Sequence, residues 1–209
     1  LGIINNAAFT LQRTVKEGKT ITQQIHLIRE EVHRSDRIIT DLMGFAQLAE
    51  GSVEPLNIPE EMDQAVEQVF PEAADFKMKI ERDYAPALPK VFMQRGHFNE
   101  IMVNILQNAR EAIPENCKIK LTASAGEGYS ILVTIEDSGP GMSQELLDQV
   151  FEPYFTTKEK GTGLGLAIVR HNVEIYGGHL KVESQLGEGT KFILQFPART
   201  LIKLQRNPG

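Results

Sequence analysis

Residues 151–169 read FEPYFTTKEKGTGLGLAIV, and their centre is a run of three alternate glycines, Gly161, Gly163 and Gly165, that leads directly into an amphipathic helical pattern. Backbone N–H groups in such a turn, together with the start of the helix, favour an anionic phosphate. Lys158 and Lys160 add positive charge just before the glycines. The segment is neither a P-loop nor a dinucleotide fingerprint, because the spacing of its glycines differs from both. It therefore predicts a phosphate-binding loop of another kind.

A second segment, EDSGPGM at residues 136–142, ends an alternating apolar pattern that is typical of a strand. The Asp137 carboxylate at that end can accept a hydrogen bond from an exocyclic amine. Gly139 and Gly141 allow the backbone to approach a flat ligand without interference from a Cβ atom. Taken alone, the pattern indicates a sharp turn more often than a purine site.

A third segment, NEIMVNILQNAREA at residues 99–112, has helical periodicity. Asn104 and Asn108 lie one turn apart and share a face of that helix. Their amide oxygens could hold a hydrated Mg²⁺, which prefers oxygen ligands and retains its waters. A solvated polar stripe is an equally good interpretation of this helix by itself.

The chain has two regions of different periodicity. From Leu1 to about Gly51, apolar residues recur at spacings of three and four, with a break around Gly18 and Thr20. This predicts two antiparallel helices whose apolar stripe meets a second copy of the chain in a four-helix bundle, although the hairpin could instead pack on its own second domain. The rest of the chain predicts a mixed sheet with helices on one face. The expected strands are 77–84, 118–124, 130–136, 180–184 and 191–196, with helices at 60–69, 96–113, 144–150 and 166–176.

The composition excludes several classes of protein. The net charge is −6 and the basic residues form no run, which argues against a nucleic-acid partner. No apolar stretch reaches the length of a membrane span, and the first residues do not form a signal peptide. The single cysteine, Cys117, excludes an internal disulfide and suits the reducing cytoplasm.

In chain order (99–112, 136–142 and 151–169), the three segments resemble the N box, the G1 box and the combined F and G2 boxes of the catalytic domain of sensor histidine kinases, which belongs to the GHKL group of ATPases. The resemblance runs from about Pro55 to Pro197, and residues 187–192 (GEGTKF) resemble the last strand of the ATP site. Residues 29–46 are similar to the second helix of the family's dimerisation and histidine phosphotransfer hairpin. The resemblance implies an α+β chain with a truncated hairpin at 1–52, a catalytic α/β sandwich of the Bergerat type at 53–198 and a tail at 199–209.

The resemblance also implies that ATP and Mg²⁺ are bound, with Asn108 and Asn104 toward the metal and Asp137 toward the adenine amino group. Thr156, Thr157, Lys158 and Lys160 are expected to form a lid over the phosphates, with Lys158 and Asn104 closest to the chemistry. The remaining expected nucleotide contacts are Glu111, Ala112, Gly139, Gly141, Met142, Gly161, Thr162, Gly163, Leu164, Gly165, Leu166 and Thr190. The lid, with five residues between Phe155 and Gly161, resembles that of the branch related to the nitrogen-regulation kinase.

The resemblance further implies transfer of the ATP γ-phosphoryl group to a histidine and then to an aspartate on a response-regulator receiver domain. In the hydrolases of the group, a glutamate occupies the position of Asn104, and an amide cannot act as a general base near neutral pH. The family's acceptor motif would fall just before Leu1, so this chain is not expected to label itself. His26 and His33 lie on the second helix, where the acceptor is not found. The alternatives are a GHKL-type ATPase that acts as a conformational clamp and an interaction module without nucleotide.

Overall fold

The computed structural model describes residues 25–28, 30, 32, 35, 52–71, 78–112, 118–158 and 161–198. Within the first fifty residues the described positions are helical, as the sequence predicts. The helical hairpin as a whole, its dimer and the tail after residue 198 lie outside the described residues. So do Lys160, Cys117 and His33.

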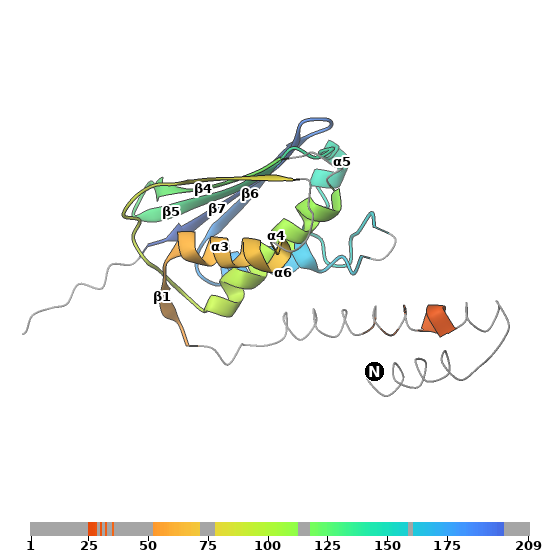
Figure 1. Ribbon diagram of the computed structural model, residues 1–209, viewed down its shortest axis with the longest axis horizontal. Coiled ribbons are helices and arrows are strands. Elements are labelled where there is room, and N and C mark those ends of the chain that lie inside the picture. The colour runs from red at the N-terminus through yellow and green to blue at the C-terminus, as the bar shows by residue number, and fades with distance from the viewer. Residues whose placement is uncertain are drawn as a thin grey trace, which may run out of the picture.

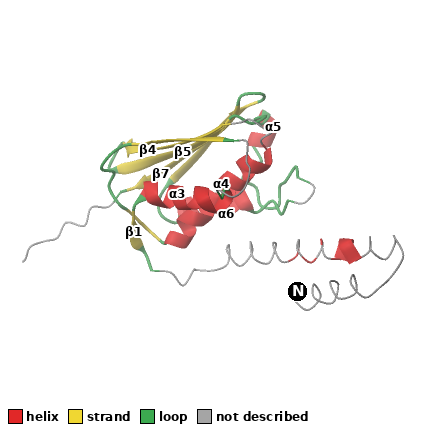
Figure 2. Cartoon of the chain, viewed as in Figure 1, coloured by secondary structure: helices red, strands yellow, loops and turns green. Residues whose placement is uncertain are grey.

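A five-stranded mixed sheet forms one layer of the described fold (Figures 1 and 2). Its strand order is β2-β4-β5-β7-β6, in which only the β2–β4 pair is parallel. This confirms the mixed sheet predicted from the sequence. The strands are β2 (Lys79–Tyr84), β4 (Lys118–Gly126), β5 (Ser130–Asp137), β6 (His179–Gln185) and β7 (Gly189–Pro197).

Three helices cover one face of the sheet, as expected: α3 (Ile58–Val69), α4 (Arg95–Ala112) and α6 (Gly165–Glu174) (Figure 1). Helix α4 lies in the middle and contacts both of the others. Alternate residues of β4, namely Ile119, Leu121 and Ala123, are buried against this layer. On α4 the buried side chains include Ile101 and Ile105, which share one face. The period of two in the strands and of about four in the helix together produce a single core.

Four element predictions need correction. A small sheet pairs β1 (Glu54–Leu56) with β3 (Val91–Met93), and neither strand was predicted because three residues are too few to show a period. Helix α3 begins two residues early, since a proline is tolerated in the first helical turn. Helix α5 (Gln144–Leu147) is shorter than expected and passes into a turn, and α6 ends at Glu174.

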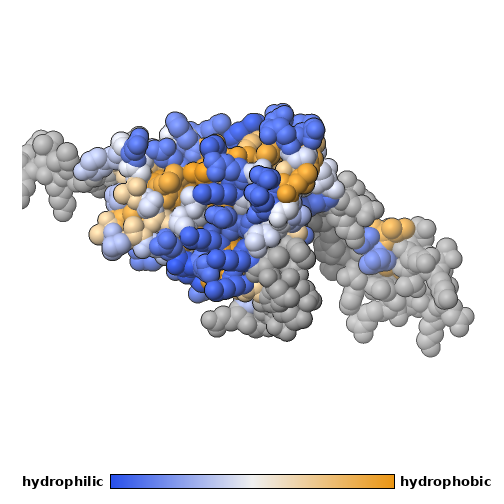
Figure 3. Space-filling view, turned by 90° about the horizontal axis from the view of Figure 1, so that it is seen from above, coloured by the Kyte–Doolittle hydropathy of each residue, from blue (hydrophilic) through white to orange (hydrophobic). Residues whose placement is uncertain are grey.

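The outer face of the sheet carries a row of alternating charges, one from each strand. Glu81, Lys120, Glu136, Lys191 and Glu183 are neighbours in register across β2, β4, β5, β7 and β6. Opposite charges at directly paired positions stabilise a sheet modestly. Figure 3 looks down on this face, which is largely hydrophilic with smaller apolar areas between the polar side chains. Among the described residues, no helix combines the length and apolarity that crossing a bilayer requires.

Candidate nucleotide site

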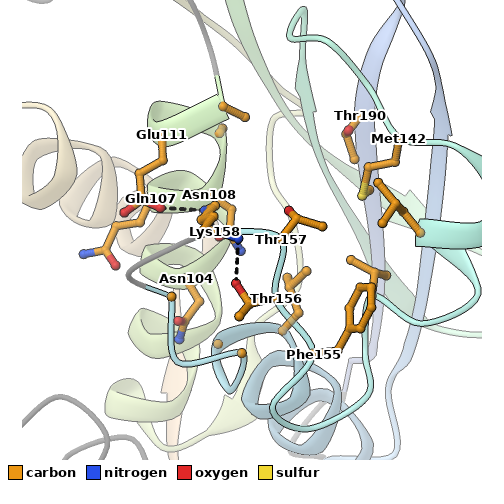
Figure 4. Close-up of a pocket in the computed structure, with 18 of the residues that line it drawn as sticks. Asn104, Gln107, Asn108, Glu111, Met142, Phe155, Thr156, Thr157, Lys158 and Thr190 are labelled. Atoms are coloured by element: carbon orange, nitrogen blue, oxygen red, sulfur yellow. Dashed lines mark hydrogen bonds and ion pairs between the residues drawn. The ribbon is translucent and has the colours of Figure 1, made fainter. Parts of the chain in front are cut away.

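A cavity of about 610 Å³ opens at the C-terminal half of α4, opposite the loop that follows β5 (Figure 4). It brings together the three segments singled out in the sequence. Sixteen of the predicted site residues line it: Asn104, Asn108, Glu111, Ala112, Asp137, Gly141, Met142, Thr156, Thr157, Lys158, Gly161, Thr162, Gly163, Gly165, Leu166 and Thr190. Gly139 and Leu164 do not line it, and Leu164 is buried in the protein.

The α4 wall of the cavity presents amide oxygens. The Asn104 amide nitrogen donates to the carbonyl of Glu100 one turn earlier, at 2.9 Å, which turns the amide oxygen away from the helix backbone. That oxygen lies against the start of α6, where a Cβ atom on Gly165 would come within 2.6 Å of it. A Cβ atom at the third glycine of the predicted phosphate loop would therefore force the Asn104 amide to shift. Asn108 lies one turn further along the same wall (Figure 4).

A lysine from the opposite wall supplies a cation to this face of α4. The Lys158 ammonium donates to Asn108 Oδ1 at 2.8 Å and to Glu111 Oε2 at 2.6 Å. These two oxygens thus already bind one cation, the ammonium of Lys158. An amide oxygen with a neighbouring carboxylate is also the kind of donor set that Mg²⁺ accepts. The residues present therefore fit the metal that the sequence predicted.

The opposite half of the cavity contains the buried carboxylate of Asp137, which is 8% exposed. The backbone N–H of Gly139 donates to Asp137 Oδ1 at 2.8 Å. Burial raises the pKa of this carboxyl above the ordinary aspartate value, although backbone N–H groups of Gly139 and Thr190 partly offset the shift. Thr190 is the register partner of Asp137 on β7, and Met142 lies beside it in Figure 4. This half therefore combines a buried carboxylate with a hydroxyl group, both of which can form hydrogen bonds to a ligand.

Two glycines allow the loop after β5 to pack closely against the β6–β7 turn, because neither has a Cβ atom. Gly141 has φ +68°, and a Cβ atom there would lie 1.9 Å from the Gln185 carbonyl oxygen. Gly189 has φ +103°, and its Cβ would lie 1.9 Å from the Asp137 carbonyl oxygen. The Gly187 N–H also donates to the Pro140 carbonyl at 2.7 Å. The sequence predicted Gly141 as a place of close approach to a ligand, and the structure adds a close approach to backbone.

The lid segment forms the third wall. The Thr156 hydroxyl oxygen accepts the Lys158 backbone N–H at 3.1 Å, and Gly163 at φ +71° accepts the Tyr154 N–H at 2.9 Å. Helix α6 then begins after Leu164, whose side chain makes no capping hydrogen bond. The first N–H groups of a helix without such a cap are suited to an anion. The start of α6, which lines the cavity at Gly165 and Leu166, is therefore a candidate position for an anionic group.

Several lining residues were not predicted as contacts: Gln107, Ala109, Pro140, Leu146, Val150, Phe155 and Phe192. Gln107 follows from the helical spacing, since it lies between the two asparagines on α4. Phe192 follows from the inward alternation of β7, where it is buried. Leu146 and Val150 gave no functional signal, because an apolar residue beside a turn looks the same in a core and in a ligand pocket.

Two of the histidines have clear structural settings. His97 is buried, and its Nδ1 lies 2.8 Å from the Tyr176 hydroxyl. Burial lowers the pKa of its imidazole. His26 lies on the exposed helical segment with Glu30 3.6 Å away. No histidine lines the described cavity.

Residues 93–200 match the family described as histidine kinase-, DNA gyrase B-, and HSP90-like ATPase. The chain is 30% identical over 180 residues to the sensor histidine kinase ZraS of Escherichia coli strain K12, covering 86% of this chain and 38% of ZraS. It is 29% identical over 208 residues to the sensory histidine kinase/phosphatase NtrB of Vibrio alginolyticus, covering 94% of this chain and 58% of NtrB. The first curated relatives are much longer proteins, of which the chain spans between 25% and 38%.

Solved structures of histidine kinases share the fold. Full-length ShkA in complex with AMPPNP is 27% identical with a TM-score of 0.75, covering 94% of this chain and 42% of ShkA. The histidine kinase ThkA in complex with the response regulator TrrA is 24% identical with a TM-score of 0.71, over 94% of this chain and 57% of ThkA. The second likeness concerns the fold alone.

Proposed function

The chain belongs to the family of histidine kinase-, DNA gyrase B-, and HSP90-like ATPases, and on that premise we propose that it is the ATP-binding kinase module of a two-component sensor. The module binds ATP with Mg²⁺ and transfers the γ-phosphoryl group to a histidine. One observation supports the choice of kinase: Asn104, an amide, lines the cavity, and the resemblance assigns the water-activating glutamate of the hydrolases to this position.

The nucleotide has a place for each of its parts. Asp137 accepts a hydrogen bond from the adenine amino group, and Gly141 and Met142 border the base. The backbone of the glycine loop and the start of α6 hold the phosphates, with Lys158 above them. Mg²⁺, when bound to Asn108 and Asn104, supplies charge neutralisation to the phosphates. The buried carboxylate, the outward amide oxygens and the uncapped helix start support this assignment.

The chemistry follows from what Asn104 can and cannot do. Its amide group is neutral, and its nitrogen already donates to the Glu100 carbonyl. The amide cannot remove a proton from water. The nucleophile must therefore be one that needs no deprotonation before it attacks, such as the unprotonated nitrogen of a neutral imidazole. The imidazole nitrogen forms a bond to the γ-phosphorus while the bond to the β–γ bridging oxygen breaks and ADP leaves. Positioning and electrostatic stabilisation provide most of the acceleration.

The remaining parts of the proposal concern the whole sensor. The helical hairpin forms a homodimer, the acceptor histidine belongs to the phosphotransfer motif of the family's hairpin, and an aspartate of a response-regulator receiver domain takes the phosphoryl group. The ThkA–TrrA complex is an example of such a partnership in a protein with the same fold. The module acts in the cytoplasm.

The test begins with the chain alone and radiolabelled ATP. We expect Mg²⁺-dependent binding, almost no steady release of phosphate and no acid-labile phosphoprotein. A longer protein that includes the acceptor motif should then become labelled on histidine. Steady hydrolysis by the chain would instead support a conformational ATPase, and failure to bind an ATP analogue would support an interaction module.

Asn108→Ala provides a sharper test of the metal side. We expect it to reduce Mg²⁺-dependent nucleotide affinity at least about tenfold, because a ligand and its orienting effect are lost. Asn99→Ala on the same helix is the matched control, since Asn99 lies outside the cavity lining. Equal binding by wild type and Asn108→Ala would show that the pocket is wrongly assigned.

A further inference from the structure

One hydroxyl group that does not line the cavity connects three segments that form its base-binding half. Ser184, near the end of β6, accepts a hydrogen bond from the Met142 backbone N–H at 2.8 Å. It donates to the Gly189 carbonyl at 2.7 Å, and its oxygen lies 2.9 Å from the Thr190 hydroxyl oxygen. Figure 4 shows Thr190 and Met142 side by side at this end of the cavity.

The direction of the Ser184–Thr190 hydrogen bond follows by elimination. A serine hydroxyl has one proton and two lone pairs. The Gly189 carbonyl can only accept, so the 2.7 Å contact takes the serine proton. The Met142 N–H can only donate, so it takes one lone pair. Thr190 must therefore donate its own proton to the remaining lone pair of Ser184.

This direction determines what Thr190 presents to the cavity. Its hydroxyl proton points to Ser184, so its oxygen offers lone pairs and no donor to a ligand. Its register partner Asp137 is a carboxylate, which when ionised also only accepts. The two polar groups in this half of the cavity thus have the same hydrogen-bonding sense. A ligand edge that donates protons satisfies them, whereas a carbonyl oxygen placed there faces two acceptors.

We propose that Ser184 is a specificity-determining positioning residue, which holds the Thr190 hydroxyl as an acceptor and so selects a purine with a 6-amino group over one with a 6-oxo group. The proposal rests on the nucleotide-binding function proposed above and deepens it. Ser184 does not touch the base; it acts on the base through the Thr190 hydroxyl.

The experiment compares the affinities of the 209-residue chain for Mg·ATP, Mg·ITP and Mg·tripolyphosphate. ATP and ITP differ at the 6-position of the purine, and tripolyphosphate has no base. Ser184→Ala frees the Thr190 hydroxyl to rotate and donate. We expect the ATP-to-ITP affinity ratio to fall about fivefold, the equivalent of one neutral hydrogen bond. Tripolyphosphate binding should stay within about twofold of wild type, because the phosphate half is untouched.

Thr190→Val removes the acceptor while leaving the other two hydrogen bonds of Ser184 in place. The proposal requires the ATP-to-ITP affinity ratio to fall in Thr190→Val as well. It also requires the double variant, Ser184→Ala with Thr190→Val, to have the same ratio as Thr190→Val alone, since the effects of coupled residues are not additive. This arm keeps the test decisive if Ser184→Ala fails to fold. An unchanged ratio in Thr190→Val, or in a folded Ser184→Ala, overturns the proposal.

Ser130→Ala is the matched control at the opposite end of the sheet. The Ser130 hydroxyl, like that of Ser184, both donates and accepts: it donates to the Glu127 carbonyl at 2.6 Å and accepts from the Gln195 amide at 2.8 Å. The ATP-to-ITP affinity ratio of Ser130→Ala should equal that of wild type. A lower ratio in this control would show that general destabilisation of the sheet explains the effect of Ser184→Ala. A wild-type chain that binds no nucleotide overturns the proposed function itself, whereas one that binds ATP and ITP equally overturns only the inference on Ser184.

Discussion

The ammonium of Lys158 donates a hydrogen bond to Asn108 Oδ1 at 2.8 Å, so a side-chain cation contacts the amide oxygen that the sequence assigns to a metal ion. The same ammonium is held by Glu111 at 2.6 Å. Two cations cannot share one amide oxygen at such distances without strong repulsion. The Lys158 ammonium must therefore leave Asn108 when a metal binds there.

The first prediction concerns this competition. Lys158→Met should lower the Mg²⁺ concentration that half-saturates binding of an ATP analogue, by up to about fivefold, because the displaced ion pair is exposed and worth little. The measurement is a Mg²⁺ titration at fixed nucleotide. Lys181→Met is the control, since Lys181 forms a similar 2.6 Å pair with Glu183 on β6, away from the cavity. An unchanged Mg²⁺ midpoint in Lys158→Met would show that the two cations do not compete.

A second prediction separates backbone strain from close contact. Gly141→Ala should abolish nucleotide binding and lower the Tm markedly, because the new Cβ would overlap the Gln185 carbonyl. Gly128→Ala has nearly the same φ, +65° against +68°, but open space around the Cβ position. It should cost only about 1 kcal/mol and leave binding intact. Thermal unfolding and nucleotide titration of both variants provide the comparison, and equal losses would contradict it.

The third prediction follows from the buried carboxylate of Asp137. Its pKa is raised in the folded chain, so its contribution to stability is present below the ordinary aspartate pKa and is lost as the pH rises through the raised value. At neutral pH its ionisation therefore opposes folding. Asp137→Asn should raise the Tm of the nucleotide-free chain by about 2–4 °C, as ~1 kcal/mol does at this size.

The same substitution should weaken the preference for ATP, since the new amide can donate as well as accept. In the wild type, ATP affinity relative to tripolyphosphate should fall as acid protonates Asp137, at a pH above the ordinary aspartate range. Asp83→Asn on the exposed edge strand β2 should change neither property. A destabilised Asp137→Asn variant with unaltered ATP preference would refute both statements.

The fourth prediction concerns the charged outer face of the sheet. Lys118 and Lys79 contact Glu81 at 2.6 and 2.8 Å, and the hydrogen bond from Lys118 is the largest cause that lowers the pKa of Glu81 to about 2. Because the folded pKa is depressed, this contribution to stability is present above the ordinary glutamate pKa and is lost as the pH falls toward about 2. Lys118→Met should raise the pKa of Glu81, as measured by NMR titration, and Lys191→Met should not.

The sequence predicted the long elements well because their periods extend over many residues. The central helix α4 was predicted within one residue at each end of the described range, and all five strands of the main sheet were found. Strands β1 and β3 were missed because their three-residue lengths show no alternation. The predicted contacts from the three motif segments gather around one cavity, which a sequence can suggest only through resemblance to proteins of known architecture.

Contacts between residues that are far apart in the sequence could not be predicted from local sequence patterns. Lys158 and Glu111 are 47 positions apart, and nothing in either local pattern marks them as partners. Ser184 looked like an ordinary polar residue in an alternating strand, and only the paired β7 and the loop after β5 give it a role. The clash at Gly189 likewise depends on a carbonyl from another strand.

The uncapped start of α6 and the last turn of α4, which carries Asn108 and Glu111, face the same cavity. Peptide dipoles give a helix a partial positive charge at its beginning and a partial negative charge at its end. The cavity thus lies between the partial positive charge at the start of α6 and the partial negative charge at the end of α4. This arrangement suits a complex of an anion with a cation better than it suits either ion alone. A nucleotide and its metal should consequently be captured as one unit, and chelating the metal should release both together.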